Sequence, residues 1–377
     1  MGESPGTRSS ADSNIDPSAA RSERFPCGHA PPRFPPRGPN ARPGIFQLAC
    51  SHGCTHSVDS APQRYPGVVP RRTLLIVNPR SRGGATGRRW KSARERLRAA
   101  MGPVDVECTR GPRDAERLAR EGVRAGVERI VVAGGDGTLS EVVAGLLGAD
   151  LARYVEIGLL PFGTGGDFSR TLGIPRSLDA AIAHLAAGRA RPIDAVCVRF
   201  RNACGEQRIS HGINVASFGL SGLAATFANR TRGGKRGPLP FLRGALRAIA
   251  SYRSAPVAIR VDGSLVHEGP VALCAAANGS FFGGGMKIAP DASAHDGLLD
   301  VVVVSDLSAA GLLLRMPAIY RGTHVRDCAV SVHRGRVVEA EPSARNLPLE
   351  IDGEPAGALP ARFELLPGAL AMIGCAE

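Results

Sequence analysis

The feature that most constrains this fold is an alternation of apolar runs and helical patterns between residues 72 and 195. The apolar runs, in chain order, are RTLLIVNP, PVDVECT, ERIVVAGG and VEIGLLP. The helical patterns that follow them are TGRRWKSARERLRAAM, RDAERLAREGVRAG, TLSEVVAGLLG and DFSRTLGIP. Strands that alternate with helices favour a parallel, doubly wound sheet. We therefore predict an α/β nucleotide-binding domain over residues 71–194.

The pattern changes near Ala195, where short apolar strands broken by glycines replace the strand–helix alternation. These strands are predicted in HGINVASFGL, PVAIRVDG, GPVALCAAANG, GLLDVVVVSD, VSVHRGRVVEAE, LPLEIDGE and ARFELLPG. Few helices interrupt them, which favours a mainly antiparallel, β-sandwich-like domain. We predict this domain over residues 195–377, with a cleft between it and the first domain and with a last strand that can return to the first domain.

Residues 1–70 are rich in Pro, Ser, Gly and Arg and have no sustained apolar period. Such a composition predicts a disordered extension outside the fold. The segment CSHGCTH, Cys50 to His56, lacks a second ligand pair at zinc-finger spacing, so we assign no zinc site to it. The nine cysteines of the chain are an odd number and are scattered, which favours a reducing compartment over a disulfide framework.

A net charge of +13 predicts an acidic partner, such as a phosphorylated ligand, anionic lipid or nucleic acid. Residues 1–72 hold nine Lys and Arg against five Asp and Glu, which leaves 38 against 29 for the rest, so the folded part is itself cationic. Few aromatic residues are present for base stacking, so we expect no nucleic-acid partner. The sequence has neither a spanning apolar run nor a signal peptide, and we expect a cytoplasmic protein.

Small or polar residues follow each predicted strand of the α/β domain: Asn78, Thr109, Gly134 to Thr138 and Gly163 to Asp167. Ligands bind at the carboxyl ends of such strands. Thr138 is predicted to cap the next helix, with Glu141 as the other half of a capping box, which would direct the positive helix end at the loop. A Gly-Asp-Gly sequence can also be a mere turn. Two such loops after consecutive strands favour phosphate binding, although neither a P-loop motif nor a GxGxxG motif is present.

Seven further motifs resemble, in family order, the soluble diacylglycerol kinase, sphingosine kinase and related lipid kinase family. They are NPRSRGG, GGDGTLSEVVAGL, LLPFGTGGDFSRTLGIP, NVASFGLSG, NGSFFGGGMKIAPDASAHDGLLDVVVV, EIDGEP and FELLPGAL, and they run from about Thr73 to Ile373. The resemblance implies transfer of the γ-phosphoryl group of ATP to the hydroxyl of a lipid such as diacylglycerol. It further implies that ATP contacts Asn78, Thr109, Gly134, Gly135, Asp136, Gly137, Thr138 and Thr164. Ser293, Asp296 and Leu298 would hold Mg²⁺, Glu354 would accept the proton, and Asp136 would assist catalysis.

The resemblance is incomplete at three positions. Ser140 and Ala144 stand where related kinases often have asparagine, and Gly166 stands where GTGND or GTAND is common. Three alternatives stay open: phosphorylation of another lipid alcohol of the sphingosine or ceramide type, an NAD kinase, which shares a GGDGT loop, and, because of Gly166, a non-catalytic lipid- or nucleotide-binding relative.

The segment from Asn229 to Arg253 carries seven Lys and Arg and no acidic residue. Phe241, Leu242, Ala245, Leu246 and Ile249 fall at helical spacing. The segment is predicted to be a membrane-surface helix or a helix packed on the β domain with a solvated basic face. Either structure favours an anionic bilayer, so we expect peripheral membrane association, and the sequence leaves a homodimer open.

Overall fold

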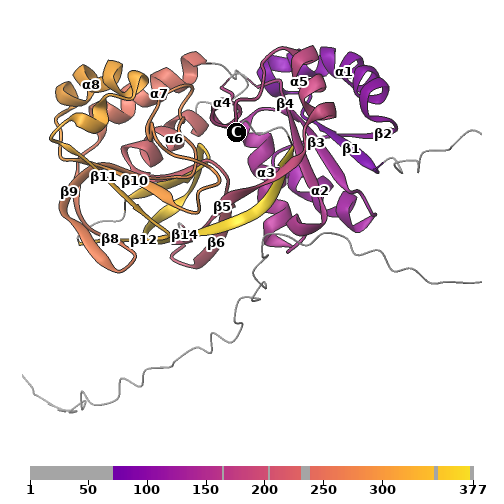
Figure 1. Ribbon diagram of the computed structural model, residues 1–377. Helices are drawn as coiled ribbons and strands as arrows, with labels where there is room; N and C mark the ends of the chain where they lie inside the picture. Colours follow the sequence, from indigo (N-terminus) through magenta and orange to yellow (C-terminus); the bar gives the residue numbers. More distant parts are fainter. Residues whose placement is uncertain (1–70, 164, 203, 231–237, 344–346, 374–377) are drawn as a thin grey trace, which may run out of the picture. The chain divides into compact units, whose positions relative to one another are not determined.

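The computed structural model describes residues 71–163, 165–202, 204–230, 238–343 and 347–373, with backbone alone for Arg230 and residues 238–243. The predicted disordered extension, residues 1–70, lies outside the described residues. The described residues form one compact unit. The sequence-based fold class is confirmed: an α/β part precedes a mainly antiparallel β part (Figure 1).

The α/β part contains four parallel strands in the order β2-β1-β3-β4. The strands are β1 (Thr73–Val77), β2 (Val104–Cys108), β3 (Arg129–Gly134) and β4 (Glu156–Pro161). The helices are α1 (Ala85–Met101), α2 (Asp114–Arg124), α3 (Asp136–Gly148), α4 (Asp167–Thr171) and α5 (Leu178–Ala187). Of these helices, α5 was not predicted.

Alternation along β3 builds a core on each face of this sheet. Ile130 and Val132 belong to a cluster with residues of α2 and α3, whereas Val131 and Ala133 belong to a cluster with residues of α1 and α5. Successive side chains of a strand point to opposite faces, so a continuous apolar run fits a strand buried on both sides. The two cores hold the parallel strands in place, and the carboxyl ends of these strands lie together at one edge of the sheet, where the polar loops begin.

The β part is built on a closed cycle of strands, in which β9 pairs with β7, then β13, β14, β12 and β8, which returns to β9. These strands are β7 (Val215–Gly219), β8 (Ala255–Val261), β9 (Ser264–Ala277), β12 (Val337–Pro342), β13 (Pro348–Ile351) and β14 (Glu354–Ile373). Outside the cycle, β10 (Leu299–Ser305) pairs with β9, and β11 (Val330–Gly335) pairs with β10. Closure leaves fewer exposed strand edges.

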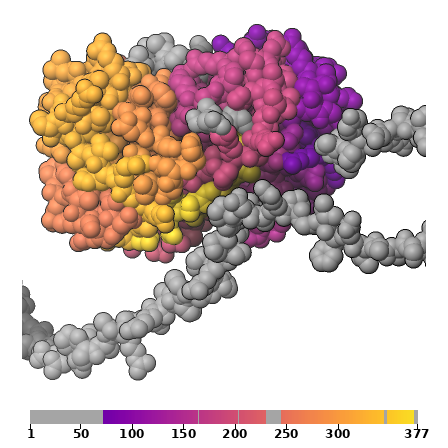
Figure 2. All heavy atoms as spheres, viewed as in Figure 1, coloured from indigo at the N-terminus to yellow at the C-terminus, as the bar shows by residue number. Residues whose placement is uncertain are grey.

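Two long strands join the parts. β5 (Ala190–Arg201) pairs with β14 from Ala190–Ile373 to Arg201–Ala358, and β6 (Gln207–Gly212) pairs with β5. The end of β14 also pairs in parallel with β4, with Ala371 opposite Glu156. In Figure 2 the yellow atoms of the C-terminal strand reach the surface between the two parts. The boundary predicted at residue 195 thus falls inside one continuous strand.

Three helices accompany the β part: α6 (Leu220–Arg230), α7 (Pro238–Ser251) and α8 (Ala309–Arg321). α7 contains the predicted apolar stripe and packs on α6, where a Cβ added to Gly244 would lie 3.1 Å from the backbone nitrogen of Ala228. Ile249 is buried and Leu246 is exposed. Among the described residues, no helix is both long and apolar enough to span a bilayer.

Candidate functional site

The junction of β3 and α3 is shorter than predicted. β3 ends at Gly134 and α3 begins at Asp136, so Gly135 alone separates them and is the N-cap. The predicted capping by Thr138 is wrong, because no side chain caps this helix. The Thr138 hydroxyl instead accepts a hydrogen bond from Nδ2 of Asn78 at 2.9 Å, and Glu141 accepts one from the backbone of Ala115 at 3.2 Å. Both side chains therefore join α3 to neighbouring segments.

The glycine-rich junction between β3 and α3 (the first junction) touches the glycine-rich junction between β4 and α4 (the second junction) through backbone atoms. A Cβ added to Gly163 would lie 2.4 Å from the Cα of Gly135, and one added to Gly135 would lie 3.1 Å from the Cα of Gly163. Any side chain at Gly163 would collide with a backbone atom. Glycine at position 163 is thus required by the close contact between the two junctions.

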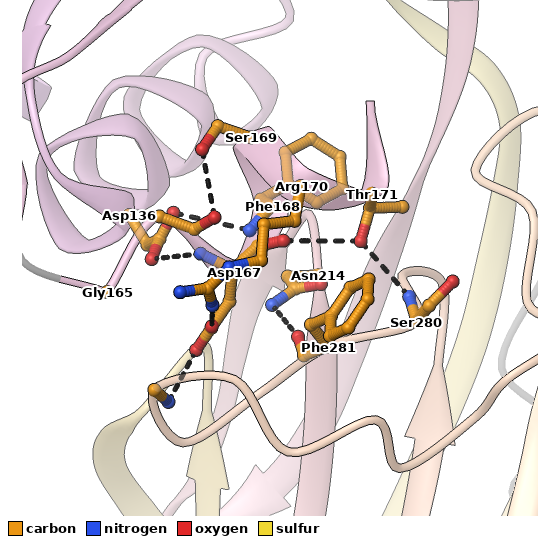
Figure 3. Close-up of polar contacts among 12 residues, drawn as sticks. Asp136, Gly165, Asp167, Phe168, Ser169, Arg170, Thr171, Asn214, Ser280 and Phe281 are labelled. Carbon is orange, nitrogen blue, oxygen red and sulfur yellow. Dashed lines mark hydrogen bonds and ion pairs between the residues drawn. The ribbon is translucent and has the colours of Figure 1, made fainter. Parts of the chain in front are cut away.

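Asp136 holds the second junction against the first. Its carboxylate accepts hydrogen bonds from the backbone nitrogen of Asp167 at 2.9 Å and that of Phe168 at 3.3 Å (Figure 3). These donors belong to the first turn of α4, where backbone N–H groups lack partners within the helix. Burial raises the pKa of Asp136 above its ordinary value, against the lowering effect of these donors. The carboxylate predicted to be catalytic therefore links the two loops by hydrogen bonds.

Asn78 and Thr109 lie at the neighbouring strand ends. The Asn78 backbone nitrogen donates to the carbonyl of Ala133 at 3.0 Å, and its side chain reaches Thr138. Thr109 is buried, and its backbone nitrogen donates to the carbonyl of Val77 at 2.8 Å. The structure thus brings Asn78 into contact with the β3–α3 junction, while Thr164 lies outside the described residues.

α4 connects this junction to the β part through Asp167 (Figure 3). The buried carboxylate of Asp167 accepts a hydrogen bond from the backbone nitrogen of Gly284 at 2.7 Å and pairs with Arg170. Burial raises the pKa of Asp167, and the nearby Asp136 carboxylate adds to that rise. The sequence placed Asp167 at a strand end but did not assign it a role.

Asn214 and Thr171 extend this connection. Oγ1 of Thr171 accepts a hydrogen bond from the backbone nitrogen of Ser280 at 3.1 Å, and Nδ2 of Asn214 donates to the carbonyl of Phe281 at 2.8 Å (Figure 3). Asn214 and the segment that contains Ser280 follow different strands of the β part, so sequence spacing gave no signal for this cluster.

Glu354 lies beside the first turn of α3. It begins β14 and is exposed, and a Cβ added to Gly137 would lie 3.9 Å from its Oε1 atom. Nδ2 of Asn229 donates to its other oxygen at 3.4 Å. The structure therefore brings the predicted proton acceptor beside Gly137 of the first glycine junction, although 217 positions separate the two in the sequence (354 − 137).

The turn that carries Glu354 is fixed by two carboxylates that the sequence did not single out. Asp352 accepts backbone hydrogen bonds from Ile213, Asn214 and Val215 at 3.0, 2.9 and 3.2 Å. Burial raises the pKa of Asp352, while a hydrogen bond from the Ser140 side chain opposes that rise. Ser140 thus joins α3 to the turn.

Glu350 lies beneath the same turn and is buried. Its carboxyl group contacts the Ser217 hydroxyl and accepts a hydrogen bond from the backbone nitrogen of Gly353 at 2.6 Å. Burial raises the pKa of Glu350 to about 8. A protonated Glu350 can donate to Ser217, whose hydroxyl in turn donates to Ser221 at 2.7 Å.

The predicted metal position contains an arginine. The Asp296 carboxylate pairs with Arg334, whose Nε lies 3.5 Å from the buried Asp300 carboxylate. Burial raises the pKa of Asp300. In the part of the chain that the structure describes, no three His, Cys, Asp or Glu side chains form a metal-binding group. The cation that faces these carboxylates is Arg334, and assignment of Mg²⁺ to Ser293, Asp296 and Leu298 stays a prediction.

Gly166 adopts a left-handed backbone, with φ 63° and ψ 39°, at the N-cap of α4. Glycine and asparagine are the residues that best tolerate this conformation. The replacement of asparagine by glycine therefore preserves the loop and removes only an amide side chain. Ala144 is half-buried on α3, and no contact of the described residues explains its identity.

Two family models match the chain. The diacylglycerol kinase catalytic domain matches residues 72–198, and the YegS C-terminal NAD kinase beta sandwich-like domain matches residues 214–374.

Three similar proteins cover most of the chain. The diacylglycerol kinase of Bacillus subtilis (strain 168) is 30% identical over 295 residues, which are 78% of this chain and 93% of that protein. A "Probable lipid kinase YegS-like" protein of Xanthomonas axonopodis pv. citri (strain 306) is 31% identical over 313 residues, with 81% and 96% coverage. A solved structure from Bacillus anthracis str. Sterne, whose description names a diacylglycerol kinase, is 25% identical, has a TM-score of 0.64 and gives 81% and 97% coverage.

Proposed function

The chain belongs to the family of diacylglycerol kinases and YegS-like lipid kinases, and from that premise we propose that it transfers the γ-phosphoryl group of ATP to the hydroxyl of diacylglycerol. The observation that carries this proposal is the position of Glu354 beside Gly137, in the first turn of α3. A proton acceptor thereby adjoins the loops proposed to bind phosphate.

ATP is proposed to bind across the paired junctions. Gly134, Gly135 and Gly137 would offer backbone groups to the phosphates, and Asn78, Thr109 and Thr138 lie at the same edge of the sheet. Thr164, outside the described residues, stays a proposed contact. Helix starts attract anions because their N–H groups and dipole carry partial positive charge. Asp136 keeps the two junctions together through Asp167 and Phe168, so its proposed role is to position the loops.

In the proposed reaction the lipid hydroxyl oxygen forms a bond to the γ-phosphorus, and the bond from that phosphorus to the oxygen bridging to the β-phosphate breaks. The hydroxyl proton passes to the Glu354 carboxylate, and ADP leaves. Positioning and charge neutralisation account for most of the acceleration in such transfers. A divalent cation, typical of kinases, would neutralise phosphate charge when bound. The proposed steps use no ion held at Asp296, because Arg334 already pairs with that carboxylate.

The substitution Glu354→Gln tests this proposal. We expect turnover to fall by about 10²- to 10⁴-fold, because the amide cannot accept the proton. The dissociation constant for ATP should stay within about twofold, since the proposed ATP contacts lie in the α/β part. Transfer of radiolabel from ATP is measured with diacylglycerol, ceramide, sphingosine and NAD as acceptors.

Glu341→Gln is the matched control, because Glu341 is an exposed glutamate of β12. Retained turnover in Glu354→Gln would remove Glu354 from the chemistry. Preferential labelling of NAD or of a sphingoid lipid by the wild-type protein would replace diacylglycerol as the acceptor.

A further inference from the structure

α8 has an unusual outer surface. None of its residues is buried, and three of its large apolar side chains are exposed: Leu313 at 45%, Leu314 at 80% and Tyr320 at 50%. Large exposed apolar side chains that gather on one surface mark a site of interaction with a partner or a membrane.

The exposed residues of α8 form one continuous arc. At 3.6 residues per turn, positions 310, 313, 314, 317, 320 and 321 fall within about a third of the helix circumference. These six exposed residues are Ala310, Leu313, Leu314, Pro317, Tyr320 and Arg321. Five of them are apolar, whereas a surface helix ordinarily turns its charged face to solvent. We call these six residues the outer arc of α8.

Exposed residues of α7 and of the segment after α8 add apolar and positively charged side chains to this end of the β part. α7 packs beside α8 at the same end of the β part (Figure 1) and contributes Leu246, which is 46% exposed. Arg247 is exposed beside Leu246 on α7, with its guanidinium carbon 5.1 Å from the centre of the Phe227 ring. Arg326 is exposed just after α8. The acidic Asp327 is paired with Arg315 at 2.7 Å, and Asp306 is exposed before the helix.

A single segment runs from α8 to the candidate active site. The backbone nitrogen of Lys287 donates to the carbonyl of Ile319 in α8 at 3.1 Å. Three residues earlier, the backbone nitrogen of Gly284 donates to Asp167 at 2.7 Å. The outer arc is therefore tied by a short stretch of chain to the glycine junctions proposed to bind ATP.

Charge identifies the occupant of the outer arc. A second copy of this chain, docked by the same surface, would bring two copies of Arg321 into one interface without an acidic residue of the outer arc to pair with them, since a twofold interface is self-complementary. An anionic bilayer instead complements these cations and accepts the apolar side chains among its acyl chains. Tyrosine also suits the boundary between headgroups and acyl chains.

We propose that the outer arc of α8, with Leu246, is the surface by which this protein docks on an anionic lipid bilayer. The inference rests on the proposed function in one respect, because a lipid substrate is reached from the membrane. In the docked protein Leu313, Leu314 and Tyr320 enter the boundary region, and the arginines meet lipid headgroups.

Sedimentation of the full chain with vesicles tests the surface without any measurement of catalysis. Wild-type protein is mixed with vesicles of phosphatidylcholine alone or with phosphatidylglycerol. The double variant Leu313→Gln/Leu314→Gln is expected to lower the partition coefficient on the anionic vesicles by about tenfold or more, because two exposed leucines lose their apolar insertion. The matched control is Ile209→Gln/Leu265→Gln, which changes residues that are 62% and 47% exposed on β6 and β9. This control should bind within about twofold of wild type.

Two further measurements separate this proposal from the proposed kinase activity. Leu314→Trp should show a blue shift and quenching by brominated acyl chains on anionic vesicles. The Gln double variant should keep turnover on a short-chain, monomeric diacylglycerol and lose it on vesicle-borne diacylglycerol. Absence of kinase activity with intact vesicle binding would overturn the proposed function and support the docking surface.

Three outcomes overturn the docking surface: no binding of the wild-type chain to anionic vesicles, equal loss in the control and the Gln double variant, or binding unchanged by Leu313→Gln/Leu314→Gln. Conversion of a lipid-free dimer to a monomer by that double variant would also overturn it, because the outer arc would then be an interface between copies.

Discussion

Asp136 and Asp352 position the two sides of the candidate site by the same kind of hydrogen bonding. Each carboxylate accepts backbone hydrogen bonds from a neighbouring segment: Asp136 from the start of α4, and Asp352 from the residues before and at the start of β7. They differ in what they position. Asp136 aligns two glycine junctions proposed to bind ATP, whereas Asp352 fixes the turn that carries Glu354. A carboxylate in a conspicuous glycine motif and one in an ordinary Asp-Gly turn can thus do the same structural work.

A third turn provides a reference for this comparison. Asp262 has φ 49° and precedes Gly263, just as Asp352 has φ 50° and precedes Gly353. The Asp262 carboxylate accepts hydrogen bonds from the backbone nitrogens of Arg336 and Val337 at 3.0 and 2.9 Å. Asp262 therefore makes the same kind of hydrogen bonds at a turn to which neither the sequence nor the structure gives a functional role.

The largest effect is expected from Gly163→Ala, which separates the two junctions. The new Cβ would lie 2.4 Å from the Cα of Gly135, and only a backbone shift can relieve that contact. We expect loss of detectable ATP binding and destabilisation by about 3 kcal/mol or more, measured by calorimetry and denaturant unfolding.

Gly111→Ala is the control for this change, because its Cβ would meet no atom within 4 Å. ATP affinity in Gly163→Ala equal to that of Gly111→Ala would show that contact between the junctions is unnecessary for the nucleotide.

The second prediction compares the three aspartates that accept these backbone hydrogen bonds. Asp136→Asn, Asp352→Asn and Asp262→Asn each replace one accepting oxygen with an NH₂ group, and each should cost about 1–3 kcal/mol of unfolding free energy. Asp136→Asn should also weaken ATP binding and remove nearly all turnover, because its loops move apart. Asp352→Asn should lower turnover while ATP affinity stays within about twofold, and Asp262→Asn should change neither.

Unfolding curves, ATP titrations and turnover of the three variants are measured together. Equal loss of ATP affinity in Asp136→Asn and Asp352→Asn would mean that the two sides of the site are not independent. Wild-type turnover in Asp136→Asn would reduce Gly-Asp-Gly to a simple turn.

The smallest effect concerns the pH dependence of stability on the Glu354 side. Glu350 has its pKa raised to about 8 by burial. Between the ordinary glutamate pKa and about 8 the folded state holds a proton that the unfolded state has released, so this contribution to stability is complete at low pH and declines as pH rises through 8. The decline should not exceed about 1.4 kcal/mol per pH unit, the slope for one proton.

Glu350→Gln should flatten this part of the unfolding free energy against pH, because the amide does not titrate. Glu341→Gln, at an exposed site, should leave the slope unchanged. The interpretation fails if Glu350→Gln retains the full wild-type slope between pH 5 and about 8.

The sequence predicted the fold class because hydrophobic periodicity is a local property. The buried alternation of β3 and the strand–helix order around it were legible in ERIVVAGG and its neighbours. Local signals failed where a residue type fits two roles. Thr138 is a residue type that often caps a helix, yet α3 begins two residues before it, and the Thr138 hydroxyl accepts a hydrogen bond from Asn78. α5 was missed although Ser177 is a capping residue that accepts a hydrogen bond from Ala180.

By itself the sequence determined the change from strand–helix alternation to a β-rich part, the glycine-rich strand ends and the family to which the chain belongs, since each is written in neighbouring residues. Only the tertiary structure decided that Gly163 packs on Gly135, that Asp352 supports the turn of Glu354, that Arg334 faces Asp296, and that α8 turns its apolar arc outward. These facts join residues tens or hundreds of positions apart, or depend on which helix face the core covers. Hydrophobic periodicity shows which side chains can be buried, whereas the packing of distant segments determines which side chains are buried.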